Sequence, residues 1–147
     1  MWGNNGYGQL GDGTFEDKNI PTKIMDNISS VSLDFDISTA ITADGILYIW
    51  GRDSSRLVSR PGTGMYIKVP TKKMDNVSSV SLVDDHIAAI TTDGTLYMWG
   101  NNGYGQLGDG TNKNKSNPTK IMTNVFSVCL GDDYSGAVTT DGSIYMW

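Results

Sequence analysis

A long internal repeat constrains the fold of this chain more than any other feature of the sequence. The thirteen residues from Trp2 to Thr14 recur without change from Trp99 to Thr111, at an offset of 97 residues. This offset equals two periods, because the four tryptophans, at positions 2, 50, 99 and 147, stand 48, 49 and 48 residues apart. We therefore expect one unit over residues 1–147 that contains three repeats, bounded at 2–49, 50–98 and 99–147.

Each repeat has the pattern of a small antiparallel sheet. Its apolar runs are short and rich in Val, Ile, Thr, Tyr and Trp, as strands are. In the first repeat the runs cover residues 28–33, 38–42 and 46–50, and a further run that follows Pro21 covers residues 22–25. Asp44-Gly45 separates two of these runs, which is a strong hairpin signal. A period near 49 residues with such runs predicts an all-β fold of β-propeller blades, each with four antiparallel strands.

The third run of each repeat indicates how the blades are arranged. Within residues 46–50, Leu47 and Ile49 point to one face of the strand, and Tyr48 and Trp50 point to the other. Neither face is polar, and the same pattern returns at residues 96–99 and 144–147. A strand that is apolar on both faces is covered on both faces, so we expect each sheet to lie between two neighbouring sheets.

The Trp-Gly-Asn-Asn-Gly-Tyr-Gly-Gln-Leu-Gly-Asp-Gly-Thr segment, the Pro-Thr-Lys segment and the run from Val128 to Trp147 resemble the repeat of the regulator of chromosome condensation family. The resemblance spans the whole chain and implies a ring of about seven blades. Three features depart from the family pattern. The glycine at the end of the inner strand is present only at Gly131, the histidine that follows it is present only at His86, and the second repeat lacks the Gly-Gln-Leu-Gly loop.

Three blades are too few for a closed ring, since propellers have about 4 to 8. The chain begins and ends at equivalent tryptophans, and the resemblance implies that two such ends jointly complete one blade. We therefore expect an incomplete ring that is a fragment of a longer propeller, or an oligomer in which a dimer completes a six-bladed ring.

Composition excludes several classes of function. A net charge of −5 disfavours nucleic-acid binding, which needs cationic side chains, and no apolar run is long enough to cross a membrane. One cysteine and one histidine exclude an internal disulfide and a multi-histidine metal site, so we expect no metal and no cofactor. Abundant Asn, Asp, Ile, Lys and Thr suggest a bacterial source, while the compartment stays open.

No catalytic residues are expected either. His86 and Cys129 occupy different positions of adjacent repeats, so they form no dyad, and we expect both to be buried structural residues. The Gly-rich loops lack the Lys-Ser/Thr pair of a phosphate-binding loop, so we interpret them as tight turns. Tyr7 and Tyr104 in these loops either stack on a partner or cover the edge of a blade.

The loop after each inner strand carries two carboxylates, which the parity of four-stranded blades places around one mouth of the central channel. These residues are Asp34 and Asp36, Asp84 and Asp85, and Asp132 and Asp133. They form a cation site, a patch for a basic partner, or only solvated turns. The absence of an Asp-x-Asp-x-Asp-Gly loop disfavours calcium.

The second repeat has the opposite charge. Between residues 50 and 74, six basic side chains, Arg52, Arg56, Arg60, Lys68, Lys72 and Lys73, oppose one acidic side chain, Asp53. By the same parity, the three arginines lie at the acidic end but at a larger radius. We hypothesise that this end meets a partner, with Arg52, Arg56 and Arg60 at the rim and Tyr66 as an anchor. The alternative is a degenerate repeat with a solvated loop.

The function expected from these features is a non-enzymatic protein–protein interaction module whose blades present loops to a protein partner. The resemblance implies two alternatives. One is a guanine nucleotide exchange factor for a small Ras-like GTPase, and the other is a propeller-type inhibitor of a secreted enzyme such as a β-lactamase.

Overall fold

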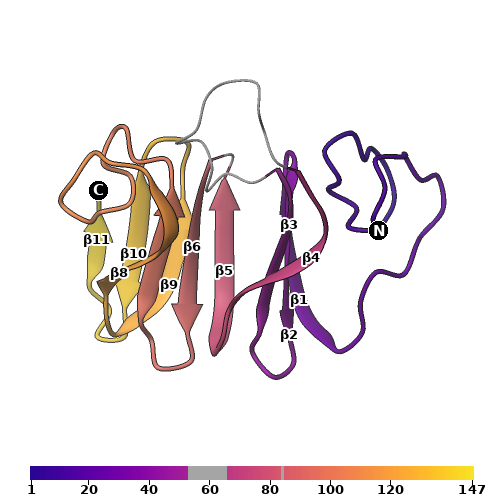
Figure 1. Cartoon of the computed structure of the whole chain (residues 1–147). Coiled ribbons are helices and arrows are strands. Elements are labelled where there is room, and N and C mark those ends of the chain that lie inside the picture. The colour runs from indigo at the N-terminus through magenta and orange to yellow at the C-terminus, as the bar shows by residue number, and fades with distance from the viewer. Residues whose placement is uncertain (53–65, 84) are drawn as a thin grey trace.

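The computed structural model describes residues 1–52, 66–83 and 85–147. Within these ranges the chain contains strands and turns and no helix. Figure 1 shows three sheets that stand side by side, with the two termini on opposite sides of the molecule. This arrangement confirms the prediction of an all-β, propeller-type fold with an incomplete ring.

The first two sheets have four antiparallel strands in sequential order, as predicted. The first sheet contains β1 (Ile28–Asp34), β2 (Ile37–Thr42), β3 (Leu47–Arg52) and β4 (Tyr66–Met74). The second sheet contains β5 (Val77–Val83), β6 (His86–Thr91), β7 (Leu96–Gly100) and β8 (Lys115–Met122). In both sheets the Asp-Gly turn joins the second and third strands, as the hairpin signal predicted.

The third sheet differs from the expectation because it has three strands. It contains β9 (Val125–Leu130), β10 (Ser135–Thr139) and β11 (Ile144–Met146), in the order β11-β10-β9. The run at residues 22–25, which we expected to be a strand, is not one. Its counterpart in β8 pairs with the complete strand β7, whereas residues 18–22 find only Met1 and Gly3 as backbone partners. A strand needs a neighbouring strand to pair with its backbone N–H and C=O groups, and residues 1–3 are too short to be one.

Two hydrophobic clusters fill the spaces between the sheets. One joins the first sheet to the second through Ile41, Leu47, Ile87 and Trp99, and the other joins the second sheet to the third through Leu96, Met98 and Ala137. All six residues of β2 and all six of β6 are buried, so these strands are covered on both faces. The prediction that the third run of each repeat is covered on both faces holds for β7, which lies between the first and third sheets, and fails for β11, whose residues are exposed.

Candidate partner-binding face

The loops between the first and second strands of the first and third sheets meet at one end of the molecule. There, an open hollow of about 580 Å³ is lined by Asp34, Phe35 and Asp36 from the first sheet and by Asp132 from the third. Val83 at the end of β5 lies between them. The structure therefore brings together carboxylates that stand almost 100 residues apart in the sequence.

Arg52 also lines this hollow, although the sequence placed it at a larger radius. It is the last residue of β3, and its backbone N–H donates to the carbonyl oxygen of Asp36 at 2.8 Å. That bond fixes the end of β3 against the acidic loop. Among the described residues that line the hollow, three carry carboxylates and one, Arg52, carries a guanidinium.

Phe35 is the residue of this face that the sequence analysis missed. Its side chain is 88% exposed, and its backbone has a positive φ of 33°. A left-handed conformation costs a non-glycine residue about 1–2 kcal/mol, and an exposed ring gains no burial in return. An aromatic residue between two aspartates in a two-residue turn was the available signal. Aromatic residues, phenylalanine included, are enriched at the cores of protein interfaces.

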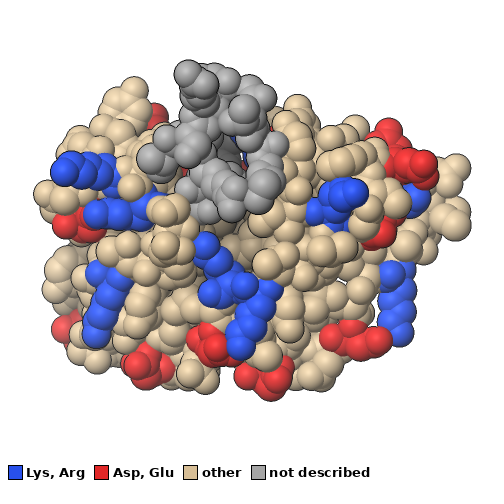
Figure 2. Space-filling view, in the orientation of Figure 1, with Lys and Arg blue, Asp and Glu red and all other residues tan. Residues whose placement is uncertain are grey.

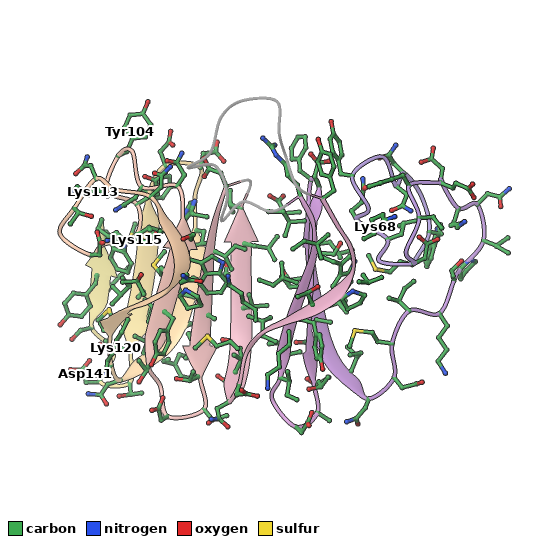
Figure 3. The ribbon with its side chains drawn as sticks, viewed as in Figure 1. Lys68, Tyr104, Lys113, Lys115, Lys120 and Asp141 are labelled. Carbon is green, nitrogen blue, oxygen red and sulfur yellow. The ribbon has the colours of Figure 1, made fainter. Side chains whose placement is uncertain are left out.

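A second group of aromatic residues lies beside the hollow. The ring of Tyr66 lies between those of Tyr7, at 5.4 Å between centroids, and Phe15, at 6.1 Å. The ammonium group of Lys68 lies 5.1 Å from the centre of the Phe15 ring. Tyr7 therefore packs on the edge of the first sheet, which is one of its two expected roles, and it also lines the hollow. Tyr104, its counterpart in the identical loop, is 76% exposed and projects from the upper end of the molecule (Figure 3).

The remaining predicted residues take different positions. Asp85 is bonded to Asn101, whose side-chain N–H donates to Asp85 Oδ2 at 2.5 Å, and Asp133 is exposed in the loop after β9. Arg56, Arg60 and Asp84 lie outside the described residues.

Figure 2 shows basic side chains across the middle of the outer surface and acidic side chains along its lower end. The end opposite the hollow is therefore acidic as well.

His86 and Cys129 stand in different environments. His86 is fully buried, as expected, and burial lowers its pKa, while the nearby carboxylate of Asp85 raises it to a smaller extent. Cys129 is exposed, so the prediction that it is buried was wrong. It lies on β9, whose sheet has no neighbour on one side.

Asp85, His86 and Ser135 form a row that resembles a hydrolase triad in its order of groups. His86 Nδ1 lies 3.5 Å from Asp85 Oδ1, and His86 Nε2 lies 3.4 Å from Ser135 Oγ. However, Ser135 is fully buried, and its hydroxyl donates to the carbonyl oxygen of Gln106 at 2.7 Å. A nucleophile must be accessible to the carbonyl carbon of a substrate, and this buried hydroxyl is not accessible. The row is part of the packing between the second and third sheets.

The two Gly-rich loops are tight turns built around a buried asparagine. The side-chain N–H groups of Asn102 donate to Asp109 Oδ1 at 3.0 Å and to the Thr111 carbonyl at 2.8 Å, and its oxygen accepts from the Leu107 N–H at 2.9 Å. Asn5 does the same in the first loop. For Asp109, burial raises the pKa, but bonds from Lys115, Thr111 and Asn102 outweigh it and lower the pKa to about 2. These loops bind themselves and offer no phosphate cradle.

Two further findings concern the described part of the chain. It contains no gathering of three or more His, Cys, Asp or Glu side chains that would hold a metal ion. It also contains no helix with the length and apolarity that crossing a membrane requires.

Comparison with known proteins identifies relatives of this architecture. A family model, the regulator of chromosome condensation (RCC1) repeat, matches residues 1–34 and 93–138, which is more than half of the chain. A second model of the same repeat matches residues 77–106. A search of curated proteins found no match.

Three solved structures resemble the chain. Human WBSCR16 has a TM-score of 0.77 at 23% identity, over 98% of this chain and 40% of that one. Prp20p from Saccharomyces cerevisiae, described with its binding properties to Gsp1p and histones, has a TM-score of 0.74 at 22% identity, over 99% of this chain and 40% of that one. Yeast RCC1 (Prp20) bound to Kap60 has a TM-score of 0.75 at 23% identity, over 99% and 38%. The chain thus spans about two fifths of the length of these proteins.

Proposed function

Because the chain belongs to the regulator of chromosome condensation (RCC1) repeat family, we propose that it is a non-enzymatic protein-interaction module. In this proposal, repeats 2–49, 50–98 and 99–147 form one rigid unit that presents its loops to a protein partner. Repeat proteins of this kind hold variable loops on a rigid frame, and binding residues concentrate on such loops.

The binding face in this proposal is the end that carries the open hollow. The observation that carries this proposal is that Asp34, Asp36 and Asp132 line one hollow. Phe35 lines the same hollow, with an exposed ring and a left-handed backbone conformation. Carboxylates gathered at one end attract a cationic partner, and an exposed aromatic ring supplies apolar contact area. The partner chemistry that fits is a Lys- or Arg-rich protein segment with an apolar residue beside its charges.

A binding titration tests this proposal. The probes are a Lys/Arg-rich peptide that contains one leucine and a Glu-rich peptide of the same length, measured by calorimetry at low and high salt. We expect binding of the basic peptide only, weaker at high salt because screening shortens the reach of surface charges. Exchanging Asp36 and Asp132 for Asn should weaken it about tenfold, at about 0.7 kcal/mol per carboxylate.

A matched control removes the same charge from the opposite end. Asp26 and Asp44 are exposed carboxylates in turns at that end, and their exchange for Asn leaves the net charge equal to that of the test variant. The proposal fails if both double variants lose affinity equally, because binding then follows net charge alone. It also fails if Phe35→Ser leaves the affinity unchanged. Among the described residues, no observation favours nucleotide exchange or enzyme inhibition over this function.

A further inference from the structure

The outer face of the third sheet is apolar and uncovered. In the second sheet, the equivalent face is buried by the third sheet, and its residues Leu96 and Met98 have no exposed surface. Their counterparts in β11, Ile144 and Met146, are 69% and 61% exposed. An apolar strand that is buried in one repeat and exposed in the next is a surface suited to another sheet.

The opposite end of the same chain carries the complementary face. The third sheet covers the second with Val125, Val128, Ala137 and Trp147. The offset of 97 residues places Ile28, Val31, Ala40 and Trp50 at the same positions of the first sheet. These four residues line a shallow hollow of about 170 Å³ on the side of that sheet away from the second sheet, together with Met1, Ile24 and Met25. Ala40 and Trp50 are already buried there, while Val31 is 61% exposed. The chain thus has both halves of its own internal interface, one at each end (Figure 1).

The third sheet also has an unoccupied position for a fourth strand. In the second sheet, β8 fills this position and pairs with β7, with Lys120 opposite Tyr97 and Thr119 opposite Met98. Residues 18–25 repeat residues 115–122 of β8 with six identities in eight. By this correspondence, residues 18–25 of another copy fit along β11, with Lys23 opposite Tyr145 and Thr22 opposite Met146.

The Gly-rich loop at residues 100–111 lacks the same neighbour. In the first loop, a methyl of Val69 in β4 lies 3.8 Å from the Cβ position of Gly13. The equivalent position at Gly110 faces open space. Ile20 corresponds to Val69 in the repeat and is 66% exposed. An incoming strand of residues 18–25 would bury Ile20 against Gly110 and cover the loop.

We propose that the outer face of β9–β11 binds a second copy of this chain, head to tail, with residues 18–25 of that copy as the fourth strand of the third sheet. The first sheet of the copy then stacks on this strand-completed sheet in the geometry of the second and third sheets. Two copies joined twice give six blades, within the range of about 4 to 8 in which propellers close.

The first two residues oppose this association. Thr22 N–H donates to the Met1 carbonyl at 3.0 Å, so Met1 occupies the place on residues 18–25 that Met146 of the second copy would take. Met146 must displace Met1, and this competition weakens the association. A chain that starts at Gly3 after removal of a cleavable tag is expected to associate at least tenfold more tightly.

Disulfide trapping tests the strand register. In a Cys129→Ser background, one copy carries Tyr145→Cys and the other carries Lys23→Cys, since directly opposed residues of antiparallel strands bring their Cβ atoms within disulfide reach. The matched control replaces Lys23→Cys with Lys120→Cys. Lys120 is an exposed lysine in the same sequence context, but it already pairs with Tyr97 of its own chain. We expect rapid oxidation of the first pair and none of the second.

Light scattering over a dilution series tests the face itself. We expect the mass to rise from 15.9 kDa toward twice that value with concentration. Met146→Lys should abolish this rise, while Thr92→Lys, which adds the same charge at an exposed turn residue of the second sheet, should not. A chain that stays monomeric at all concentrations, with or without residues 1 and 2, overturns the proposal. Equal trapping of Lys23→Cys and Lys120→Cys also overturns it, because contact is then unspecific.

Discussion

At the scale of single residues, the two buried asparagines do most to define the loops. Asn102 has no exposed surface, and its amide satisfies one backbone N–H and several oxygen atoms of a loop that has no strand or helix of its own. The backbone N–H and C=O groups of a buried loop need hydrogen-bond partners, and here the amide of one asparagine provides several of them. Asn5 repeats the arrangement, which explains why both positions carry the same residue.

Asn102→Ala is expected to lower the free energy of unfolding by about 2–3 kcal/mol, because it leaves the buried Leu107 N–H without a partner and removes one of the hydrogen bonds to the Asp109 carboxylate. Urea unfolding followed by tryptophan fluorescence measures the change. Asn112→Ala is the control, since Asn112 is an exposed residue of the same loop and makes one bond, to the Gly103 carbonyl. Equal losses in the two variants would contradict the role assigned to Asn102.

The sequence predicted tight turns in these loops but not the asparagines that organise them. The glycines carry a local signal, because a left-handed backbone selects glycine wherever it occurs. The partners of Asn102 lie 5 to 11 residues away and become visible only when the loop closes. Phe35 escaped prediction for a related reason, since its exposure depends on a hollow formed by loops from different repeats.

At the scale of elements, each Gly-rich loop is locked onto the sheet that follows it. The carbonyl oxygen of Gln106 accepts from the Trp147 indole at 2.9 Å and from the Ser135 hydroxyl at 2.7 Å. The carbonyl oxygen of Gln9 accepts from Trp50 and Ser38 at the same two distances. Trp147 therefore has two roles, because its ring packs between the second and third sheets while its N–H holds a loop.

Gly108→Ala should release this lock. Gly108 has a φ of +69°, and an added Cβ would lie 2.7 Å from the indole nitrogen of Trp147. We expect a loss of about 1 kcal/mol from the backbone and about 1–3 kcal/mol more from the clash, with a change in tryptophan emission. Gly110→Ala is the matched control, because Gly110 has a φ of +77° and nothing within 4 Å. The clash is refuted if the two variants unfold at the same denaturant concentration.

Strand positions were predictable from short apolar runs, and the exceptions have one physical cause. Residues 22–25 have the same residues as the end of β8 and yet form no strand, because β-structure depends on a paired neighbour and not on local preference alone. The same dependence makes the third sheet three-stranded. Local sequence specifies which segments are able to pair, and the rest of the molecule decides whether they do.

At the scale of the whole molecule, His86 stands at the joint between the second and third sheets. It begins β6, has no exposed surface, and its Nε2 lies near Ser135 of β10. Burial disfavours the imidazolium, so the pKa of His86 in the folded chain is below its ordinary 6.5, despite the opposing effect of Asp85. In the unfolded chain the histidine regains its ordinary pKa.

Stability should therefore decline as the pH falls through 6.5, because the unfolded state binds the proton more readily than the folded state. The slope is at most about 1.4 kcal/mol per pH unit for one group. Thermal unfolding between pH 8 and pH 5 measures it, and His86→Leu should flatten the slope. Tyr134→His places a histidine at the equivalent, exposed position of the third repeat, so in a His86→Leu background it should add no slope. A slope that survives His86→Leu would assign it to other groups.

The lock between loop and sheet has a consequence for how such arrays diversify. In the second repeat the Gly-Gln-Leu-Gly loop is missing, and the position of Ser38 and Ser135 holds Ile87, which is buried in the cluster between the first two sheets. A hydroxyl that has lost its acceptor would be a buried, unsatisfied donor, and an aliphatic side chain removes that cost. Loop and receptor residue have changed together. The unit that varies between repeats is therefore the Gly-rich loop together with the serine that bonds it, two segments about 30 residues apart in the chain that must change together.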